Sequence, residues 1–174
     1  IIKRLREGHR DVKIIIGGTH AILSPEECIE AADIVCLGEG EFPFLELLRN
    51  YSNGLESIKK IPGLWVKQNG QIYKNQINEL IDINQIPVID YSNDNKWYIE
   101  NDTVKTGDPL IGNSVGEIFS SRGCPYHCTY CTNNVLKSIM REGKFVRLRS
   151  VDNVIKDIYN IKGYFKNFKK VVFA

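Results

Sequence analysis

The chain has 174 residues, of which 43% are hydrophobic and 25% charged, a composition typical of a soluble globular protein. Its formal net charge of +2 is too small to indicate a nucleic-acid partner. No apolar run approaches the length of a membrane span, and no signal-peptide pattern opens the chain, so we expect a cytoplasmic protein. The lysines near the end alternate with apolar residues and predict a solvated helix face rather than a phosphate-binding patch: Lys162, Lys166, Lys169 and Lys170.

Residues 1–10 predict the end of an amphipathic helix, with Gly8 near its stop. Residues 13–18 (KIIIGG) then form a β-branched run closed by glycines, typical of a strand buried on both faces in a parallel sheet. Because the chain begins at Ile1 inside a predicted helix and stops at Ala174 after a strand-like run, we interpret it as an internal fragment of a longer protein.

The next segments repeat the alternation of helix and strand. Ser24 is a predicted N-cap, followed by Pro25 and two acids in the first turn of a helix that reaches about Ala32. Residues 33–37 (DIVCL) predict a second buried strand, and 38–41 (GEGE) lead into a helix rich in Phe and Leu. This order predicts an α/β sheet with parallel strands, of the doubly wound, Rossmann-like kind.

A hairpin and a linker follow. Two alternating runs flank Asn69 and Gly70, a strong signal for a hairpin over residues 63–75. Residues 76–113 show no clear periodicity and carry many Asn and Asp, so we expect a linker. Four apolar residues are expected to pack it on its neighbours: Ile86, Val88, Tyr91 and Trp97.

The last part again predicts strand, loop, helix and strand. Residues 115–120 (VGEIFS) are strand-like and run straight into a cysteine-rich loop. Ser150 is a predicted cap of a helix from Val151 to about Ile161, with Gly163 as its stop, and residues 170–173 begin another buried strand.

Three of the five cysteines, Cys124, Cys128 and Cys131, lie within eight residues. This clustering does not fit a secreted disulfide framework and indicates metal or redox chemistry. Iron–sulfur clusters are held by thiolates, and a four-iron cluster usually takes four. Cys28 in a predicted helix and Cys36 in a buried strand fit small core residues better than a fourth ligand. The spacing therefore favours a [4Fe–4S] cluster with one iron that the protein does not bind.

Two other metal proteins were weighed against this hypothesis. A structural zinc site needs four closed ligands, and His127 is adjacent to Cys128, which hinders both from binding one tetrahedral ion. An electron-transfer ferredoxin would need a fourth cysteine nearby. The open-iron cluster is the better interpretation of the loop.

The spacing Cys-x3-Cys-x2-Cys, with Tyr130 directly before the third cysteine and Arg-Gly-Cys-Pro at its start, resembles the cluster loop of radical S-adenosylmethionine (radical SAM) enzymes. In that family the loop follows the first strand of a partial (β/α) barrel. The resemblance implies that Cys124, Cys128 and Cys131 bind the [4Fe–4S] cluster and that Tyr130 packs near the adenine of S-adenosylmethionine. It also implies a small-molecule substrate and an external electron donor of the flavodoxin or ferredoxin type.

The chemistry implied by this resemblance explains the open iron. That iron binds the amino and carboxylate groups of S-adenosylmethionine, and one electron from the reduced cluster breaks a carbon–sulfur bond to give methionine and a 5′-deoxyadenosyl radical. Arg147, Arg149 and Ser150 resemble the stretch that opens the first barrel helix. Surface charge and an N-cap explain these three residues equally well.

The segments before the loop resemble the second half of a cobalamin-binding domain, with Gly17-Gly18-Thr19-His20 first and 38–41 (GEGE) later. The resemblance implies that Gly17, Gly18, Gly38 and Gly40 bind cobalamin, with the glycine pair admitting its nucleotide tail. The cobalt-ligating element Asp-x-His-x-x-Gly is not present, and neither His9 nor His20 matches it.

We therefore expect three segments: a partial cobalamin-binding-type domain (1–75), a linker (76–113) and the N-terminal part of a radical SAM domain (114–174). The expected function is cobalamin-dependent methyl transfer to a poorly activated carbon. Alternatives are a radical SAM cyclase or rearrangement enzyme without functional cobalamin, and a catalytically inactive metal-binding fragment.

Overall fold

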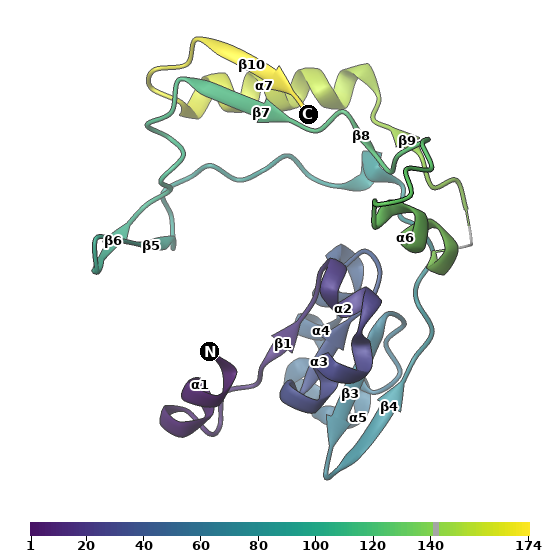
Figure 1. Cartoon of the computed structure of the whole chain (residues 1–174). Coiled ribbons are helices and arrows are strands. Elements are labelled where there is room, and N and C mark those ends of the chain that lie inside the picture. Colours follow the sequence, from purple (N-terminus) through teal and green to yellow (C-terminus); the bar gives the residue numbers. More distant parts are fainter. Residues whose placement is uncertain (141–142) are drawn as a thin grey trace. The chain divides into compact units, whose positions relative to one another are not determined.

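The computed structural model describes residues 1–140 and 143–174 (Figure 1). They fall into two compact units, Ile1–Ile81 with Pro125–Phe145 and Asp82–Cys124 with Val146–Ala174. Each unit is built from two separated segments of the chain. The units therefore do not correspond one to one with the three segments expected from the sequence, whose assignment stays a prediction.

The first unit contains a four-stranded sheet in the order β1-β2-β3-β4. β1 and β2 are parallel, as predicted, whereas β3 runs antiparallel to both β2 and β4. Asn69 and Gly70 join β3 to β4 with positive φ angles of 50° and 79°, as a type I′ hairpin turn requires. The predicted hairpin is thus confirmed. The strand bounds are Ile15–Ile16 (β1), Ile34–Cys36 (β2), Leu64–Gln68 (β3) and Gln71–Lys74 (β4).

Helices cover both faces of β2. Val35 and Leu37 pack in one core with residues of α2 and α3, while Ile34 and Cys36 pack in a second core with residues of α4 and α5. The prediction of a buried strand at 33–37 is confirmed. The prediction that the first strand is buried on both faces was wrong, because Ile15 of β1 is 37% exposed. The helices of the unit are α1 (Ile2–Gly8), α2 (Thr19–Leu23), α3 (Pro25–Ala31), α4 (Glu41–Asn50), the 3-10 helix η1 (Tyr51–Asn53), α5 (Leu55–Ile58) and α6 (Asn133–Ile139).

Asp33 ties α1 to the sheet. Its carboxylate accepts a hydrogen bond from the Ile14 N–H at 2.9 Å, forms an ion pair with Arg6, and lies 3.6 Å from Lys13. Burial by itself raises the pKa of this carboxyl. The hydrogen bonds from Ile14 and Arg6 and the charges of Lys13 and Arg6 outweigh burial, so the pKa of Asp33 is lower than usual.

Ser24 does not cap α3 with its side chain, so this prediction was wrong. The sequence pattern did not reveal α2, and Ser24 is the residue that ends it: its N–H donates to the carbonyl of His20 at 2.9 Å. Its dihedral angles (φ −137°, ψ 58°) differ from the extended ones that an N-cap normally adopts. Pro25 does begin α3, as predicted.

The second unit contains a parallel pair, β7 (Val115–Ile118) and β10 (Lys170–Phe173), joined through α7 (Val151–Tyr164). Figure 1 shows α7 lying along the pair. The predicted strand–helix–strand order is confirmed, and the Ser150 side chain caps α7 by accepting from the Asn153 N–H at 3.2 Å. Gly163 does not stop the helix, which continues to Tyr164 because the Phe165 N–H still bonds to the carbonyl of Ile161.

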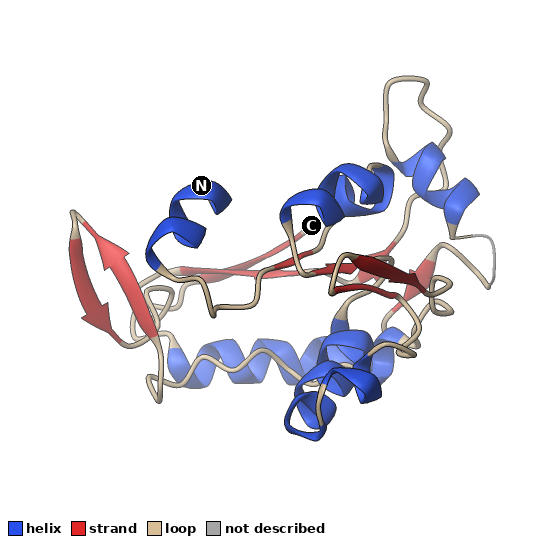
Figure 2. Ribbon diagram, turned by 90° about the horizontal axis from the view of Figure 1, so that it is seen from below, coloured by secondary structure: helices blue, strands red, loops and turns tan. Residues whose placement is uncertain are grey.

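The predicted linker contains structure of its own. It holds the 3-10 helix η2 (Ile83–Gln85) and a separate hairpin of β5 (Trp97–Glu100) and β6 (Thr103–Thr106), seen as two strands at the left of Figure 2. Tyr91 is buried against Ile118 and Phe165, as predicted. Trp97 is 64% exposed and Val88 39% exposed, so their predicted packing was wrong. Trp97 lies in a hairpin that forms a sheet of its own.

A short antiparallel pair completes the second unit. β8 (Ser121–Arg122) follows β7 and pairs with β9 (Arg147–Leu148), which precedes α7. None of the described helices is both long and apolar enough to cross a lipid bilayer.

Gly116 allows α7 to approach β7. A Cβ at this position would lie 2.7 Å from Cγ2 of Ile161, a β-branched side chain that is 1% exposed and has little freedom to move. We expect Gly116→Ala to lower the free energy of unfolding by about 1–3 kcal/mol, measured by urea denaturation. Gly112→Ala is the control, because a Cβ there would meet nothing within 4 Å. Equal loss in both variants would contradict this close packing.

Candidate functional site

The cysteine loop connects β8 to α6, and its three thiols belong to two units. Cys124 is the last residue of its segment in the second unit, whereas Cys128 and Cys131 lie in the first. Cys128 is exposed, the other two are partly exposed, and all three are free thiols.

Local hydrogen bonds fix the second half of the loop. The Cys131 N–H donates to the carbonyl of Cys128 at 3.1 Å, and the side-chain amide of Asn134 donates to the same carbonyl at 2.7 Å. The first turn of α6 therefore holds the backbone that carries these two thiols. Asn134 was not predicted as a site residue. The available signal was an Asn pair (Asn133, Asn134) directly after the loop, where a helix begins.

The donor set fits an iron–sulfur cluster in its chemistry. Iron–sulfur clusters take cysteine thiolates, and the loop offers three unpaired, accessible thiols within eight residues. In the part of the chain that the structure describes, no three His, Cys, Asp or Glu side chains converge on a position that could hold a metal ion. The cluster stays a prediction for these three thiols.

The other two cysteines lie in the core of the first unit. Cys28 and Cys36 are 4% and 7% exposed and belong to the two cores on either side of β2. Burial raises the pKa of the Cys28 thiol, and the charge of Glu27 raises it further. Burial likewise raises the pKa of the Cys36 thiol, with Glu41 adding to the effect. Both therefore remain neutral thiols at neutral pH.

The aromatic residues of the loop are open to solvent. Tyr130 is 90% exposed and Tyr126 is 72% exposed, so each has a free ring face. The His127 ring nitrogen Nε2 lies 3.2 Å from the ammonium group of Lys137 on α6. The structure therefore places His127 against a cation of the first unit.

The four predicted cobalamin residues lie in two places of the first unit. Gly17 and Gly18 follow β1, and Gly38 and Gly40 follow β2. A Cβ at Gly18 would meet nothing within 4 Å, whereas one at Gly38 would lie 3.3 Å from the Asn78 side chain. Gly18 is thus open, while the chain itself covers Gly38.

Two helices far apart in the sequence pack together in the first unit. α2 begins at Thr19, directly after the glycine pair, and it contacts α6, which begins two residues after Cys131. Since α2 and α6 belong to the same unit, the second half of the cysteine loop and the glycine turn lie on one compact body.

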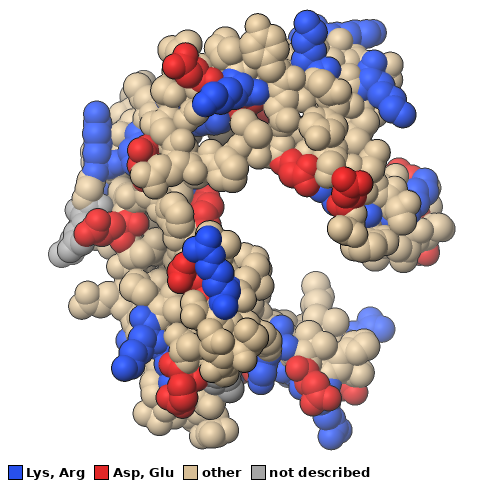
Figure 3. All heavy atoms as spheres, turned by 180° about the vertical axis from the view of Figure 1, so that it is seen from behind, with Lys and Arg blue, Asp and Glu red and all other residues tan. Residues whose placement is uncertain are grey.

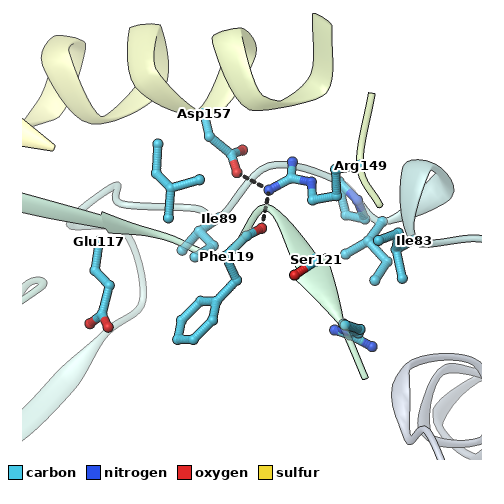
Figure 4. A pocket seen from close by; sticks show the side chains of 11 residues that line it. Ile83, Ile89, Glu117, Phe119, Ser121, Arg149 and Asp157 are labelled. Carbon is cyan, nitrogen blue, oxygen red and sulfur yellow. Dashed lines mark hydrogen bonds and ion pairs between the residues drawn. The ribbon is translucent and has the colours of Figure 1, made fainter. Parts of the chain in front are cut away.

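The second unit contains a pocket of about 140 Å³ beside β7 (Figure 4). The predicted residue Arg149 lines it and forms an ion pair with Asp157 of α7. Apolar residues of the linker form much of the wall: Ile83, Ile86, Pro87 and Ile89.

On the face seen in Figure 3, basic and acidic side chains are interspersed.

No protein-family model matches the chain. The chain is 31% identical over 178 aligned residues to the "Uncharacterized methyltransferase PH0819" of Pyrococcus horikoshii, covering 99% of this chain and 35% of that protein. It is 28% identical over 172 residues to the cytidylyl-2-hydroxyethylphosphonate methyltransferase of Streptomyces wedmorensis, covering 84% and 31%. The chain thus spans about a third of the length of these curated relatives.

Solved structures of cobalamin-dependent radical enzymes share the fold. OxsB, a cobalamin-dependent S-adenosylmethionine radical enzyme, matches 99% of this chain and 22% of its own, with a TM-score of 0.62 and 18% identity. TsrM, a radical S-adenosylmethionine methyltransferase from Kitasatospora setae, matches 99% and 32%, with a TM-score of 0.59 and 16% identity. The α/β fold class is confirmed, and it is similar to the fold of these enzymes. The partial barrel stays a prediction.

The five thiols should differ in their reaction with iodoacetamide at pH 8. Under anaerobic, metal-free conditions we expect Cys128, Cys124 and Cys131 to be alkylated first, because they are exposed or partly exposed. Cys28 and Cys36 should react only after unfolding in urea, because burial blocks them and raises the pKa of both thiols. Mass spectrometry of tryptic peptides measures the order. Early labelling of Cys36 would contradict its place in the core.

Proposed function

We propose that this chain belongs to a radical SAM enzyme that uses a [4Fe–4S] cluster and cobalamin to transfer a methyl group to a poorly activated carbon. The cysteine loop supports the cluster, and two methyltransferase relatives support methyl transfer. The shared fold with OxsB and TsrM supports the combination of the two cofactors, since TsrM has been solved with cobalamin and a [4Fe–4S] cluster bound.

The contact between α6 and α2 is the observation that carries this proposal. A methyl group passes between cofactor and substrate only when both can be held close together. In the first unit, the helix that follows Cys131 packs on the helix that follows Gly18. This packing supports a cluster loop and a cobalamin turn that serve one reaction.

Cys124, Cys128 and Cys131 would each bind one iron through a thiolate, leaving one iron for S-adenosylmethionine. When bound, such a cluster supplies the electron that cleaves S-adenosylmethionine to a 5′-deoxyadenosyl radical. Tyr130 has an exposed ring that can stack on the adenine. Asn134 orients the backbone between Cys128 and Cys131 through its bond to the Cys128 carbonyl.

Gly17 and Gly18 would admit the nucleotide tail of cobalamin, because the absence of a side chain at Gly18 leaves the backbone open. Gly38 and Gly40 would contribute to cobalamin binding at the end of the next strand. The Asn78 side chain covers Gly38. Neither His9 nor His20 is proposed as a cobalt ligand. His20 lies 3.9 Å from Glu27 on the neighbouring helix.

The proposal includes a small-molecule substrate and an external electron donor of the flavodoxin or ferredoxin type, both in the cytoplasm. Ring formation or rearrangement by a radical SAM enzyme without functional cobalamin is the second candidate reaction. A metal-binding chain without activity is the third candidate.

Anaerobic reconstitution with iron and sulfide tests the cluster. We expect about four irons per chain in the wild type, and loss of the cluster absorbance in Cys128→Ala, because the loop has no spare thiolate. Cys28→Ala is the control, since Cys28 is buried in the core. Metal analysis that finds zinc instead of iron, or a cluster that survives in Cys128→Ala, would overturn the proposal.

Cobalamin binding is tested by the visible absorption of the corrinoid that stays with the protein through gel filtration. Gly18→Val should weaken retention by at least about tenfold, because its side chain would occupy the open space at the turn. Gly54→Val is the matched control: both glycines have φ +87° and nothing within 4 Å. Equal loss of corrinoid retention in both variants would show that backbone strain, and not a blocked cobalamin site, causes the loss. A wild type that retains no corrinoid would support the cobalamin-independent alternative.

A further inference from the structure

The first cluster thiol, Cys124, follows a short segment that the second unit holds tightly. β8 pairs with β9 through Ser121 with Leu148 and Arg122 with Arg147. Gly123 then turns the chain with a positive φ of 83°, directly before Cys124. The position of Cys124 therefore depends on the backbone of residues 119–122.

Arg149 holds that backbone at the end of β7. Its N–H donates to the carbonyl of Ser120 at 2.9 Å, and its guanidinium donates to the carbonyl of Phe119 at 3.4 Å. The same guanidinium reaches the carbonyl of Asn153 in the first turn of α7, at 3.3 Å. One side chain thus connects the strand end before the cysteine loop to the helix behind it.

Asp157 fixes the guanidinium in this position. The two side chains form an ion pair with exposed fractions of only 14% for Arg149 and 11% for Asp157, and Figure 4 shows the guanidinium between Asp157 and Phe119. Asp157 is the one charged residue that is buried in the described part of the chain. A buried ion pair often stabilises no better than an apolar pair of similar volume, whereas removal of one partner leaves the other charge buried and unpaired.

We propose that Asp157 and Arg149 are positioning residues that set the place of Cys124 for cluster binding. This inference rests on the proposed cluster and deepens it, because neither residue touches the cluster. Arg149 acts through the carbonyls of Phe119 and Ser120, which lie five and four residues before the thiol. The guanidinium donates to Phe119 and Asp157 from Nη1 and to Asn153 from Nη2, and Lys has only one nitrogen with which to reach these acceptors.

The role can be tested with Asp157→Asn and Arg149→Lys in the full chain. Asp108→Asn is the matched control, because Asp108 also belongs to the second unit, is also nearly buried (side chain 10% exposed) and pairs with Lys96 at 2.8 Å. In the metal-free protein, Asp157→Asn should raise the alkylation rate of Cys124 several-fold relative to Cys128, while Asp108→Asn leaves that ratio unchanged.

The second readout is the reconstituted cluster. Asp157→Asn should lower the iron content from about four towards about three per chain and change the electron paramagnetic resonance spectrum of the reduced cluster. Arg149→Lys keeps the charge beside Asp157 and should keep the wild-type thermal stability but not the wild-type spectrum. A changed spectrum at unchanged thermal stability would separate a positioning role from a merely structural one.

Two results decide between the claims. A wild-type chain that takes up no cluster would overturn the proposed function. A wild-type chain with its cluster, beside an Asp157→Asn variant with the same spectrum and the same alkylation ratio as Asp108→Asn, would overturn only the positioning role.

Discussion

Burial of β2 on both faces is the constraint on which the first unit depends. A strand of three residues, Ile34–Cys36, places alternate side chains in two separate cores. Helices must therefore cover both faces, which fixes α2 and α3 on one side and α4 and α5 on the other. The turns after β1 and β2 then lie at the same edge of the sheet, because parallel strands end there together.

The glycine turn, Gly17-Gly18, lies at that edge. Its proposed role depends on a second packing contact, that of α6 with α2. α6 belongs to the chain about a hundred residues later, yet it packs on α2. Asn134 and the first turn of α6 hold Cys128 and Cys131, so the backbone that presents two thiols is fixed by the same body that presents Gly18. In the second unit, Arg149 and Asp157 fix the strand end that leads to Cys124.

The sequence predicts the chemistry of the cysteine loop from local residues alone. Three thiols within eight residues need no tertiary information to indicate a metal site, and a hairpin turn is recorded in Asn69-Gly70. Ser150 was predicted correctly as a cap for the same reason: the cap bonds an N–H three residues away. Ser24 was predicted wrongly because an unrecognised short helix, α2, ends at that residue and sets its backbone angles.

By itself, then, the sequence determined the α/β class, the order of strands and helices, the hairpin and the candidate ligands, which depend mainly on residues near one another in the chain. Tertiary structure alone decided three other features: the contact of α6 with α2, the covering of Gly38 by Asn78, and the ion pair of Arg149 with Asp157. The first joins helices about a hundred residues apart and the second joins residues 40 positions apart, and no periodicity in the sequence indicates such contacts. Arg149 and Asp157 are eight residues apart, but only the fold buries the pair and brings the guanidinium to the Phe119 carbonyl, at the strand end before Cys124.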